Sequence, residues 1–129
     1  MKIAQIAPLM ESVPPRLYGG TERVVSHLCE ALVRKGHEVT LFASGDSITS
    51  ADLVPCTTEA IRLNPAIKDY IPHYMIMLDK VRRIARRFDV LQRHAQWIVL
   101  RRVVMLQTLA QGAVQVHARG RVEVMPARQ

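Results

Sequence analysis

The sequence has little cysteine and no long apolar run. Cys29 and Cys56 are the two cysteines among 129 residues. They are too few and too unpatterned for a disulfide framework or a zinc site, and such usage fits a reducing compartment. No apolar run approaches the roughly 18 residues that a membrane-spanning helix needs. Gln5 interrupts the apolar start MKIAQIAPLM, which argues against a signal peptide. We therefore expect a cytoplasmic protein with one modest core.

Spacings typical of metal ligands are also missing. The five histidines are scattered through the chain, at positions 27, 37, 73, 94 and 117. No two of them stand at the separations that zinc sites use. We therefore expect no bound metal.

Acidic residues are scarce in the last third of the chain. The net charge of +7 would suit nucleic acid or an anionic membrane as a partner. Residues 1–89 hold 12 Lys and Arg against 10 Asp and Glu, whereas residues 90–129 hold six Arg against Glu123 alone. The basicity thus belongs to residues 90–129, and nucleic acid is not expected as a partner of the whole protein.

The first 43 residues predict a parallel strand–helix–strand unit. Lys2–Ala7 is short and apolar, as expected of a strand buried on both faces. Apolar residues recur at helical spacing over Thr21–Lys35, and Gly36 is a natural stop. Glu38–Ala43 has the β-branched and aromatic residues of a second strand. Such a βαβ unit predicts an α/β, Rossmann-like fold with a parallel sheet.

Two adjacent glycines stand just before the expected helix. Gly19 and Gly20 precede Thr21, the expected N-cap, in a loop that also holds Arg16. Paired glycines let a ligand approach the main chain closely, and the first amides of a helix have no internal partner. Because the helix dipole also favours negative charge there, these four residues predict a phosphate site. The alternative interpretation is a tight turn and a helix cap with no ligand.

The middle of the chain gives a second helix and a third strand. Residues 48–71 are expected to be irregular, since prolines such as Pro55 interrupt them. A helix is predicted to open at Pro72. Its expected apolar stripe consists of Met75, Leu78, Val81, Ile84 and Ala85. Phe88–Leu91 is typical of a third parallel strand, and His94 would lie at its carboxyl end.

The tail, residues 92–129, fits neither the helical nor the strand period cleanly. Trp97–Leu106 is apolar but interrupted by two arginines. Valines alternate around Arg119 and Gly120, which suggests a weak hairpin. These valines are Val114, Val116, Val122 and Val124. A segment rich in Arg, Ala, Val and Gln and nearly free of acids is also what a shifted reading frame in GC-rich DNA gives. We therefore expect residues 92–129 to be a frame-shifted or divergent segment.

The motifs of the first 91 residues resemble a known enzyme family. KIAQIAP, YGGTERVVSHLCEALVRKGHEVTLFASGDS and RRIARRFDVL follow one another along the chain. In this order and spacing they resemble the N-terminal domain of the retaining GT-B glycosyltransferases of family 4. The resemblance implies hexosyl transfer from a nucleotide-sugar donor to an acceptor, with no metal or other cofactor. It also implies that Gly19 and Gly20 approach the donor diphosphate.

The chain departs from the family pattern in two places. Relatives continue after FDV with a motif close to IHxH, whereas here Gln92 replaces the first histidine and His94 falls at the second. His94 is therefore the candidate acceptor contact. The second Rossmann-like domain, which in the family binds the nucleotide sugar and carries a pair of glutamates, has no counterpart in the 129 residues. We expect the chain alone to be inactive and the missing C-terminal domain to be its partner.

A different class of function also fits the sequence. The alternative is a non-catalytic binding module whose basic tail contacts nucleic acid or an anionic membrane. The arginines within Arg82–Arg87 are expected to form a solvated helix face, with peripheral membrane contact as the alternative. A third hypothesis is an unstable gene fragment without a function.

Overall fold

The computed structural model describes residues 1–94, 115–116 and 122–123. The helices are α1 (Gly20–Arg34) and α2 (Ile71–Ile84), with two short 3-10 turns, η1 (Ile61–Leu63) and η2 (Ala85–Arg87). The strands are β1 (Lys2–Ile6), β2 (Glu38–Ser44), β3 (Asp52–Thr57), β4 (Val90–Arg93), β5 (Gln115–Val116) and β6 (Val122–Glu123). No helix in this described part of the chain is long and apolar enough to cross a membrane.

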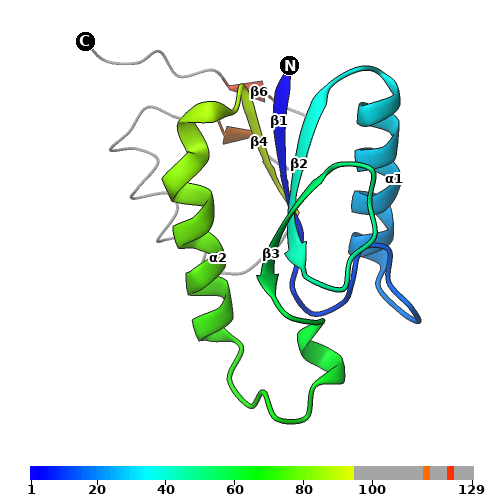
Figure 1. Cartoon of the computed structure of the whole chain (residues 1–129), viewed down its shortest axis with the longest axis vertical. Coiled ribbons are helices and arrows are strands. Elements are labelled where there is room, and N and C mark those ends of the chain that lie inside the picture. The colour runs from blue at the N-terminus through cyan, green and yellow to red at the C-terminus, as the bar shows by residue number, and fades with distance from the viewer. Residues whose placement is uncertain (95–114, 117–121, 124–129) are drawn as a thin grey trace.

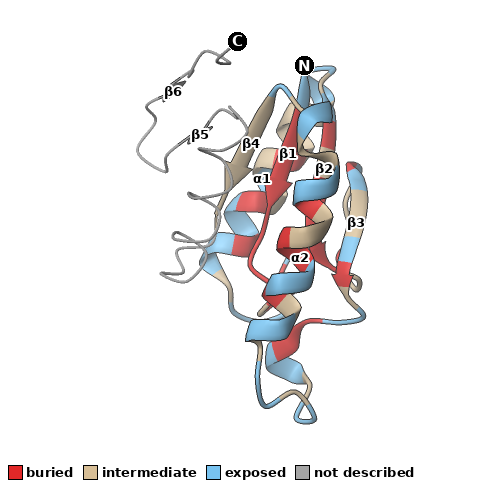
Figure 2. Ribbon diagram, turned by 90° about the vertical axis from the view of Figure 1, so that its left-hand side faces the viewer, coloured by how far each residue is buried: buried red, intermediate tan, exposed pale blue. Residues whose placement is uncertain are grey.

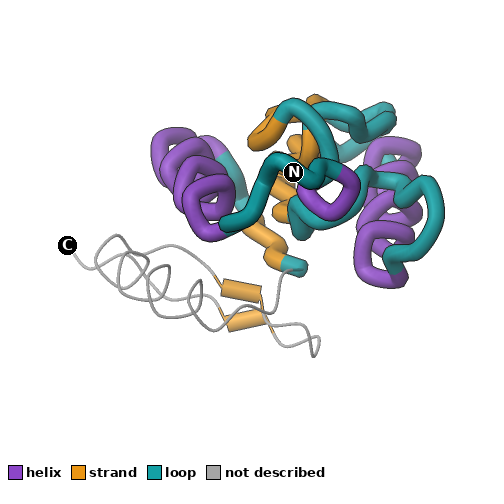
Figure 3. Tube along the Cα trace, turned by 90° about the horizontal axis from the view of Figure 1, so that it is seen from below, coloured by secondary structure: helices purple, strands orange, loops and turns teal. Residues whose placement is uncertain are grey.

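The strands form one sheet in the order β3-β2-β1-β4-β5-β6. All neighbouring strands run parallel except β5 and β6, which pair antiparallel. The helices α1 and α2 lie on opposite faces of the sheet (Figures 1 and 3). This is the α/β, Rossmann-like arrangement that the strand–helix–strand pattern predicts, and it confirms the expected fold class.

The core is divided into two layers by the period-2 alternation of the strands. In β2, Val39 and Leu41 pack with α1 residues such as Val25 and Cys29. Phe42 faces the other way, into a cluster that includes Met77 of α2. The strand β1 is buried along nearly its whole length (Figure 2). A strand covered on both faces needs the near-continuous apolar sequence that residues 2–7 have.

The ends of α1 follow from glycine. Gly36 has φ of 85°, in the left-handed region that glycine adopts readily. The amide of Gly36 donates to the Val33 carbonyl and the amide of His37 to the Leu32 carbonyl, which is a Schellman closure. The prediction of Gly36 as the stop is thus confirmed. The prediction of Thr21 as N-cap is wrong, because Gly19 holds that position and Thr21 lies inside the first turn.

The helix α2 is rotated from the predicted apolar stripe. Leu78 and Val81 are buried as expected, together with Tyr74 and Met77. Met75 is 46% exposed, so its place in the stripe was wrong. Tyr74 is drawn inward because its hydroxyl accepts a hydrogen bond from the Leu9 amide at 3.0 Å. A partner 65 residues away in the sequence leaves no trace in the helical periodicity.

The strand β3 lies in the segment that we expected to be irregular. Pro55 is part of it, and β3 is the edge strand of the sheet, with β2 as its neighbour. Proline is tolerated on an edge strand because one side of that strand needs no ladder donor. The third predicted strand also shifts, from Phe88–Leu91 to β4.

The predicted hairpin in the tail is confirmed where the structure describes it. β5 and β6 pair antiparallel, with Val116 opposite Val122. Val114, Val124, Trp97–Leu106 and the turn at Arg119 and Gly120 lie outside the described residues. The boundary after residue 91 and the frame-shifted or divergent tail stay predictions.

Candidate functional site

Three segments meet at the carboxyl edge of the parallel sheet. The loop of residues 7–19 follows β1, Ser44 and Ser47 follow or end β2, and His94 follows β4. Because β1 lies between β2 and β4, the loop leaves the middle of this edge. In open parallel sheets this is the edge where ligands bind. The expected phosphate and acceptor residues therefore lie on the same side of the fold.

The first half of this loop is fixed by hydrogen bonds to distant elements. The Val13 amide donates to Ser47 Oγ at 2.9 Å, and the Ile48 amide donates to the Val13 carbonyl at 2.8 Å. Near the start of the loop, the Ile61 amide donates to the Leu9 carbonyl at 2.9 Å. Residues 7–9, 11–13 and 15 are buried. Most of the loop up to Pro15 is therefore buried, with Pro14 exposed.

The second half of the loop is open. Leu17 and Tyr18 are each 79% exposed. Arg16 is also exposed and forms no ion pair with any residue that the structure describes. The guanidinium that the sequence assigns to a diphosphate is thus not engaged by another described side chain.

Gly19 and Gly20 have different surroundings although they are neighbours. A Cβ atom on Gly19 would lie 2.8 Å from Glu22 Oε2 and 3.0 Å from Pro15 Cβ, so at least one of these neighbours would have to shift. A Cβ atom on Gly20 would meet nothing within 4 Å. Packing inside the protein therefore favours glycine at position 19. Gly20 leaves bare main chain facing open space.

Two amides of the first turn of α1 have no partner among the described residues. The Arg23 amide donates to the Gly19 carbonyl at 3.1 Å, as the first helical bond. The Glu22 amide donates to its own carboxylate. This leaves the amides of Gly20 and Thr21, both on exposed residues, without hydrogen bonds inside the described structure. Unpaired amides at a helix N-terminus are suited to bind an anion.

Two buried carboxylate side chains lie close to Gly19. Glu11 and Glu22 are 4% and 6% exposed, and Arg62 lies 3.0 Å from Glu11 Oε1. Burial raises the pKa of Glu22, and the charge of Glu11 raises it further, while its own amide and Arg62 act in the opposite direction. The Arg62 guanidinium thus pairs with Glu11 and also favours the ionised form of Glu22. The cluster supports the Gly19 side of the turn and leaves the Gly20 side to solvent.

The His94 side chain contacts Gln5 on β1, which in turn contacts Gln92 on the neighbouring strand β4. The backbone amide of His94 donates to the Ile6 carbonyl at 3.0 Å, and its Nε2 lies 2.6 Å from Gln5 Oε1. Gln5 in turn donates from Nε2 to Gln92 Oε1 at 3.1 Å. Burial lowers the pKa of His94. A neutral, hydrogen-bonding imidazole is therefore expected at this edge near neutral pH.

The sequence predicted five residues for this candidate site and did not indicate the side chains that support them. Gly19, Gly20, Thr21 and Arg16 lie in one loop and helix start, but no hydrogen bond or ion pair joins them to His94. The supporting cluster of Glu11, Glu22 and Arg62 was missed, because its members are far apart in the sequence. Gln5 gave a usable signal, since a glutamine inside a fully buried strand must have a hydrogen-bonding partner.

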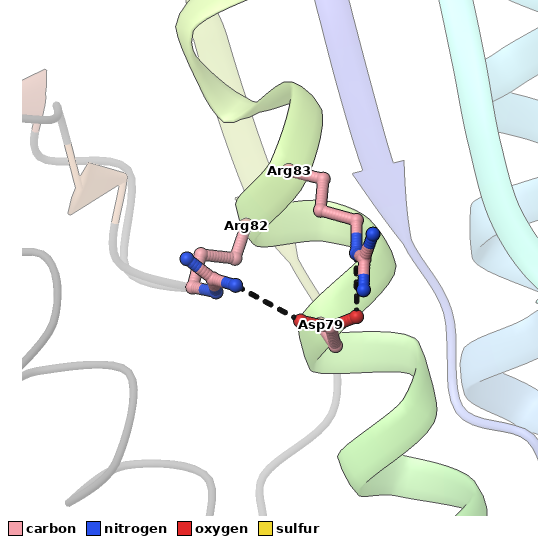
Figure 4. A network of polar contacts seen from close by, with 3 residues as sticks. All are labelled: Asp79, Arg82 and Arg83. Carbon is pink, nitrogen blue, oxygen red and sulfur yellow. Dashed lines mark hydrogen bonds and ion pairs between the residues drawn. The ribbon is translucent and has the colours of Figure 1, made fainter.

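The arginines of α2 lie away from this edge, toward the C-terminal end of the helix. Asp79 Oδ1 lies 3.1 Å from Arg82 Nη2, and Asp79 Oδ2 lies 2.7 Å from Arg83 Nε (Figure 4). These hydrogen bonds lower the pKa of Asp79. Arg86 and Arg87 are exposed in the following turn. The prediction of a solvated basic face therefore agrees with the exposure of these side chains.

The fold and the glycine turn at this edge define a class of protein. A parallel sheet with a helix on each face, and a glycine turn opening the first helix, is a Rossmann-like α/β domain. In residues 1–94, 115–116 and 122–123 no group of three His, Cys, Asp or Glu side chains is arranged to hold a metal ion.

Comparison with known proteins places the chain within that class. The family model for Glycosyltransferase Family 4 matches residues 18–118. The chain belongs to glycosyltransferase family 4. The match begins just before Gly19 and runs past residue 91 into the tail. No curated protein sequence matches the chain.

Proposed function

We propose that this chain is the N-terminal, acceptor-side part of a GT-B glycosyltransferase that uses a nucleotide-sugar donor. One observation carries the proposal: the exposed amides of Gly20 and Thr21 have no partner in the described structure. They open a 15-residue helix at the carboxyl edge of a parallel sheet. Membership of glycosyltransferase family 4 supplies the chemistry that such an anion seat would serve.

The donor diphosphate is proposed to bind at the start of α1. Its oxygens would accept hydrogen bonds from the amides of Gly20 and Thr21, while Gly19 holds the turn in place and Arg16 adds positive charge. In glycosyl transfer the nucleoside diphosphate is the leaving group. Negative charge develops on it as the bond between the sugar's anomeric carbon and the diphosphate oxygen breaks. Preorganised amides and a guanidinium stabilise that charge without a metal ion. We propose that no cofactor is required.

The acceptor is proposed to meet His94. A neutral imidazole can exchange hydrogen bonds with the hydroxyl group of an acceptor, and the lowered pKa of His94 keeps the ring neutral. The donor nucleotide would be held by a second Rossmann-like domain, the expected partner. We propose that residues 1–129 alone have no transferase activity. The two free, buried thiols, Cys29 and Cys56, support a cytoplasmic location.

Amide-resolved NMR of the ¹⁵N-labelled chain, titrated with inorganic pyrophosphate and with uridine diphosphate, tests the donor seat. The NMR signals of the Gly20 and Thr21 amides should shift most, and the two ligands should compete for the same site. Arg16→Gln should weaken pyrophosphate binding roughly tenfold, as expected for a charged hydrogen bond.

Arg34→Gln is the matched control for this experiment, because Arg34 is also exposed but lies at the other end of α1. It should leave the affinity for pyrophosphate unchanged. Equal weakening by both variants would show binding by general positive charge. Shifts confined to residues outside 16–21 would overturn the proposed donor seat.

A peripheral membrane contact is the second candidate, favoured by the surface of α2. The helix exposes Ile71, Met75 and Ile76 as well as basic residues toward its C-terminal end. Apolar and basic side chains on one helix suit an anionic lipid surface. Sedimentation with vesicles of anionic lipid at low and high salt tests it. Arg86→Glu with Arg87→Glu should abolish binding, and retention by neutral vesicles would contradict the electrostatic part of the proposal.

A further inference from the structure

Gln5 is a polar side chain in the most protected part of the sheet. It lies on β1, between β2 and β4, and is fully buried. It pairs in register with Leu41 on one side and Gln92 on the other. A buried amide group is costly unless both its oxygen and its nitrogen are hydrogen-bonded. We therefore expect the Gln5 amide to make hydrogen bonds that a leucine or valine side chain could not make.

Both ends of the Gln5 amide are used, and each meets a side chain of the β4 segment. Nε2 donates to Gln92 Oε1 at 3.1 Å. Oε1 lies 2.6 Å from His94 Nε2. Gln92 is the residue directly across from Gln5, and His94 stands two residues further along the same chain. The three side chains thus form one row that ends at the carboxyl edge of the sheet.

The direction of this row determines which imidazole nitrogen carries the proton. Since the Gln5 nitrogen donates to Gln92, the Gln5 oxygen is the atom that faces His94, and it can only accept. His94 Nε2 must then donate, so it carries the hydrogen. Burial disfavours the imidazolium form, and the neutral ring has one proton. Nδ1 is left bare, and it has no hydrogen bond to any described residue.

We propose that Gln5 is a positioning residue that fixes His94 in the Nε2–H tautomer, so that Nδ1 is the hydrogen-bond acceptor at the carboxyl edge. The step from this tautomer to an acceptor sugar rests on the proposed function. Nδ1 would accept a hydrogen bond from the incoming hydroxyl group and orient its oxygen toward the donor. Gln92 supplies the oxygen that accepts the hydrogen bond from the Gln5 nitrogen.

The tautomer of His94 can be read directly from long-range ¹H–¹⁵N correlation spectra of the labelled chain. The expected result for the unaltered protein is a protonated Nε2 and a bare Nδ1. His27, exposed on α1, serves as an internal control with no such restraint. A protonated Nδ1, or an even mixture of the two forms, would overturn the proposal without any variant being made.

Two substitutions at Gln5 separate positioning from mere core packing. Gln5→Met keeps the size of the side chain but removes the acceptor. The ratio of the Nε2–H form of His94 to the Nδ1–H form should therefore fall roughly fivefold, the equivalent of about 1 kcal/mol. Gln5→Glu keeps an acceptor oxygen and adds negative charge, so the Nε2–H should persist and the pKa of His94 should rise. A purely structural role for Gln5 would predict equal tautomer ratios in all three folded proteins.

The same spectra distinguish failure of this inference from failure of the proposed function. Addition of a simple sugar acceptor such as maltose should perturb Nδ1 more than Nε2 if His94 meets an acceptor hydroxyl. A fixed Nε2–H tautomer with no response to the sugar would uphold the Gln5 assignment and count against the acceptor role. A mixed tautomer would refute the Gln5 assignment whether or not the sugar binds.

Discussion

The two neighbouring glycines should respond in opposite ways to the same added methyl group. Gly19→Ala places a Cβ atom 2.8 Å from Glu22 Oε2, 3.0 Å from Pro15 Cβ and 3.3 Å from Glu11 Cγ. Overpacking of this kind costs about 1–3 kcal/mol of folding free energy. Gly20→Ala places its Cβ atom in open space. It should stabilise the protein by about 0.4–1 kcal/mol, because alanine has fewer conformations to lose on folding.

Urea unfolding followed by circular dichroism gives the difference between the two variants. A gap of about 2 kcal/mol corresponds to a midpoint shift of roughly 1 M urea for a small domain. Gly45→Ala calibrates the scale, since its Cβ atom would lie 2.7 Å from the backbone oxygen of Thr57 and has no flexible neighbour to displace. It should be at least as damaging as Gly19→Ala.

For pyrophosphate binding, in contrast to stability, Gly20→Ala should be a damaging substitution. Gly20→Ala should fold at least as well as the unaltered chain yet bind pyrophosphate several-fold more weakly, because its methyl group lies beside the exposed amides. If Gly19→Ala proves as stable as the unaltered protein, the packing argument is wrong. If Gly20→Ala binds pyrophosphate normally, the open face at Gly20 is not where the anion sits.

Three further outcomes follow from buried groups. Burial raises the pKa of Glu22, so its ionised form opposes folding at pH 7, and that penalty disappears as the pH falls toward about 4. Glu22→Gln should therefore be more stable than the unaltered protein at pH 7, and this advantage should shrink in acid. Urea midpoints that differ equally at both pH values would contradict this. Tyr74→Phe leaves the buried Leu9 amide without its acceptor and should cost about 1–3 kcal/mol in the same assay, whereas an unchanged midpoint would show that water replaces the hydroxyl. Burial raises the pKa of Cys29 and of Cys56 to about 11, so a thiol reagent at pH 8 should label neither cysteine until urea unfolds the chain, and rapid labelling of the folded protein would be the contrary result.

How far the site was predictable depends on how locally each part is encoded. The glycine turn and the start of α1 lie within a few residues of each other, so the sequence placed the helix start to within two residues, at Thr21 where the structure has Gly19 as N-cap. The contrast between Gly19 and Gly20 did not follow from the sequence, because it arises from Glu11, Pro15 and Glu22 packing on one side only. The Gln5 row joins segments 87 and 89 residues apart, and the spacing of the residues alone could not pair them.

The sequence by itself determined the parallel strand–helix–strand unit. Apolar periodicity, the Gly36 stop and the β-branched strand at Glu38–Ser44 act over one or two turns or a few residues, where main-chain conformation is decided. Tertiary structure decided the rest. Pro55 became part of a strand because that strand falls on the sheet edge. Tyr74, not Met75, turned inward because the Leu9 amide needed an acceptor. Buried polar groups must find partners wherever the fold brings them, and those distances are set only once the sheet is assembled.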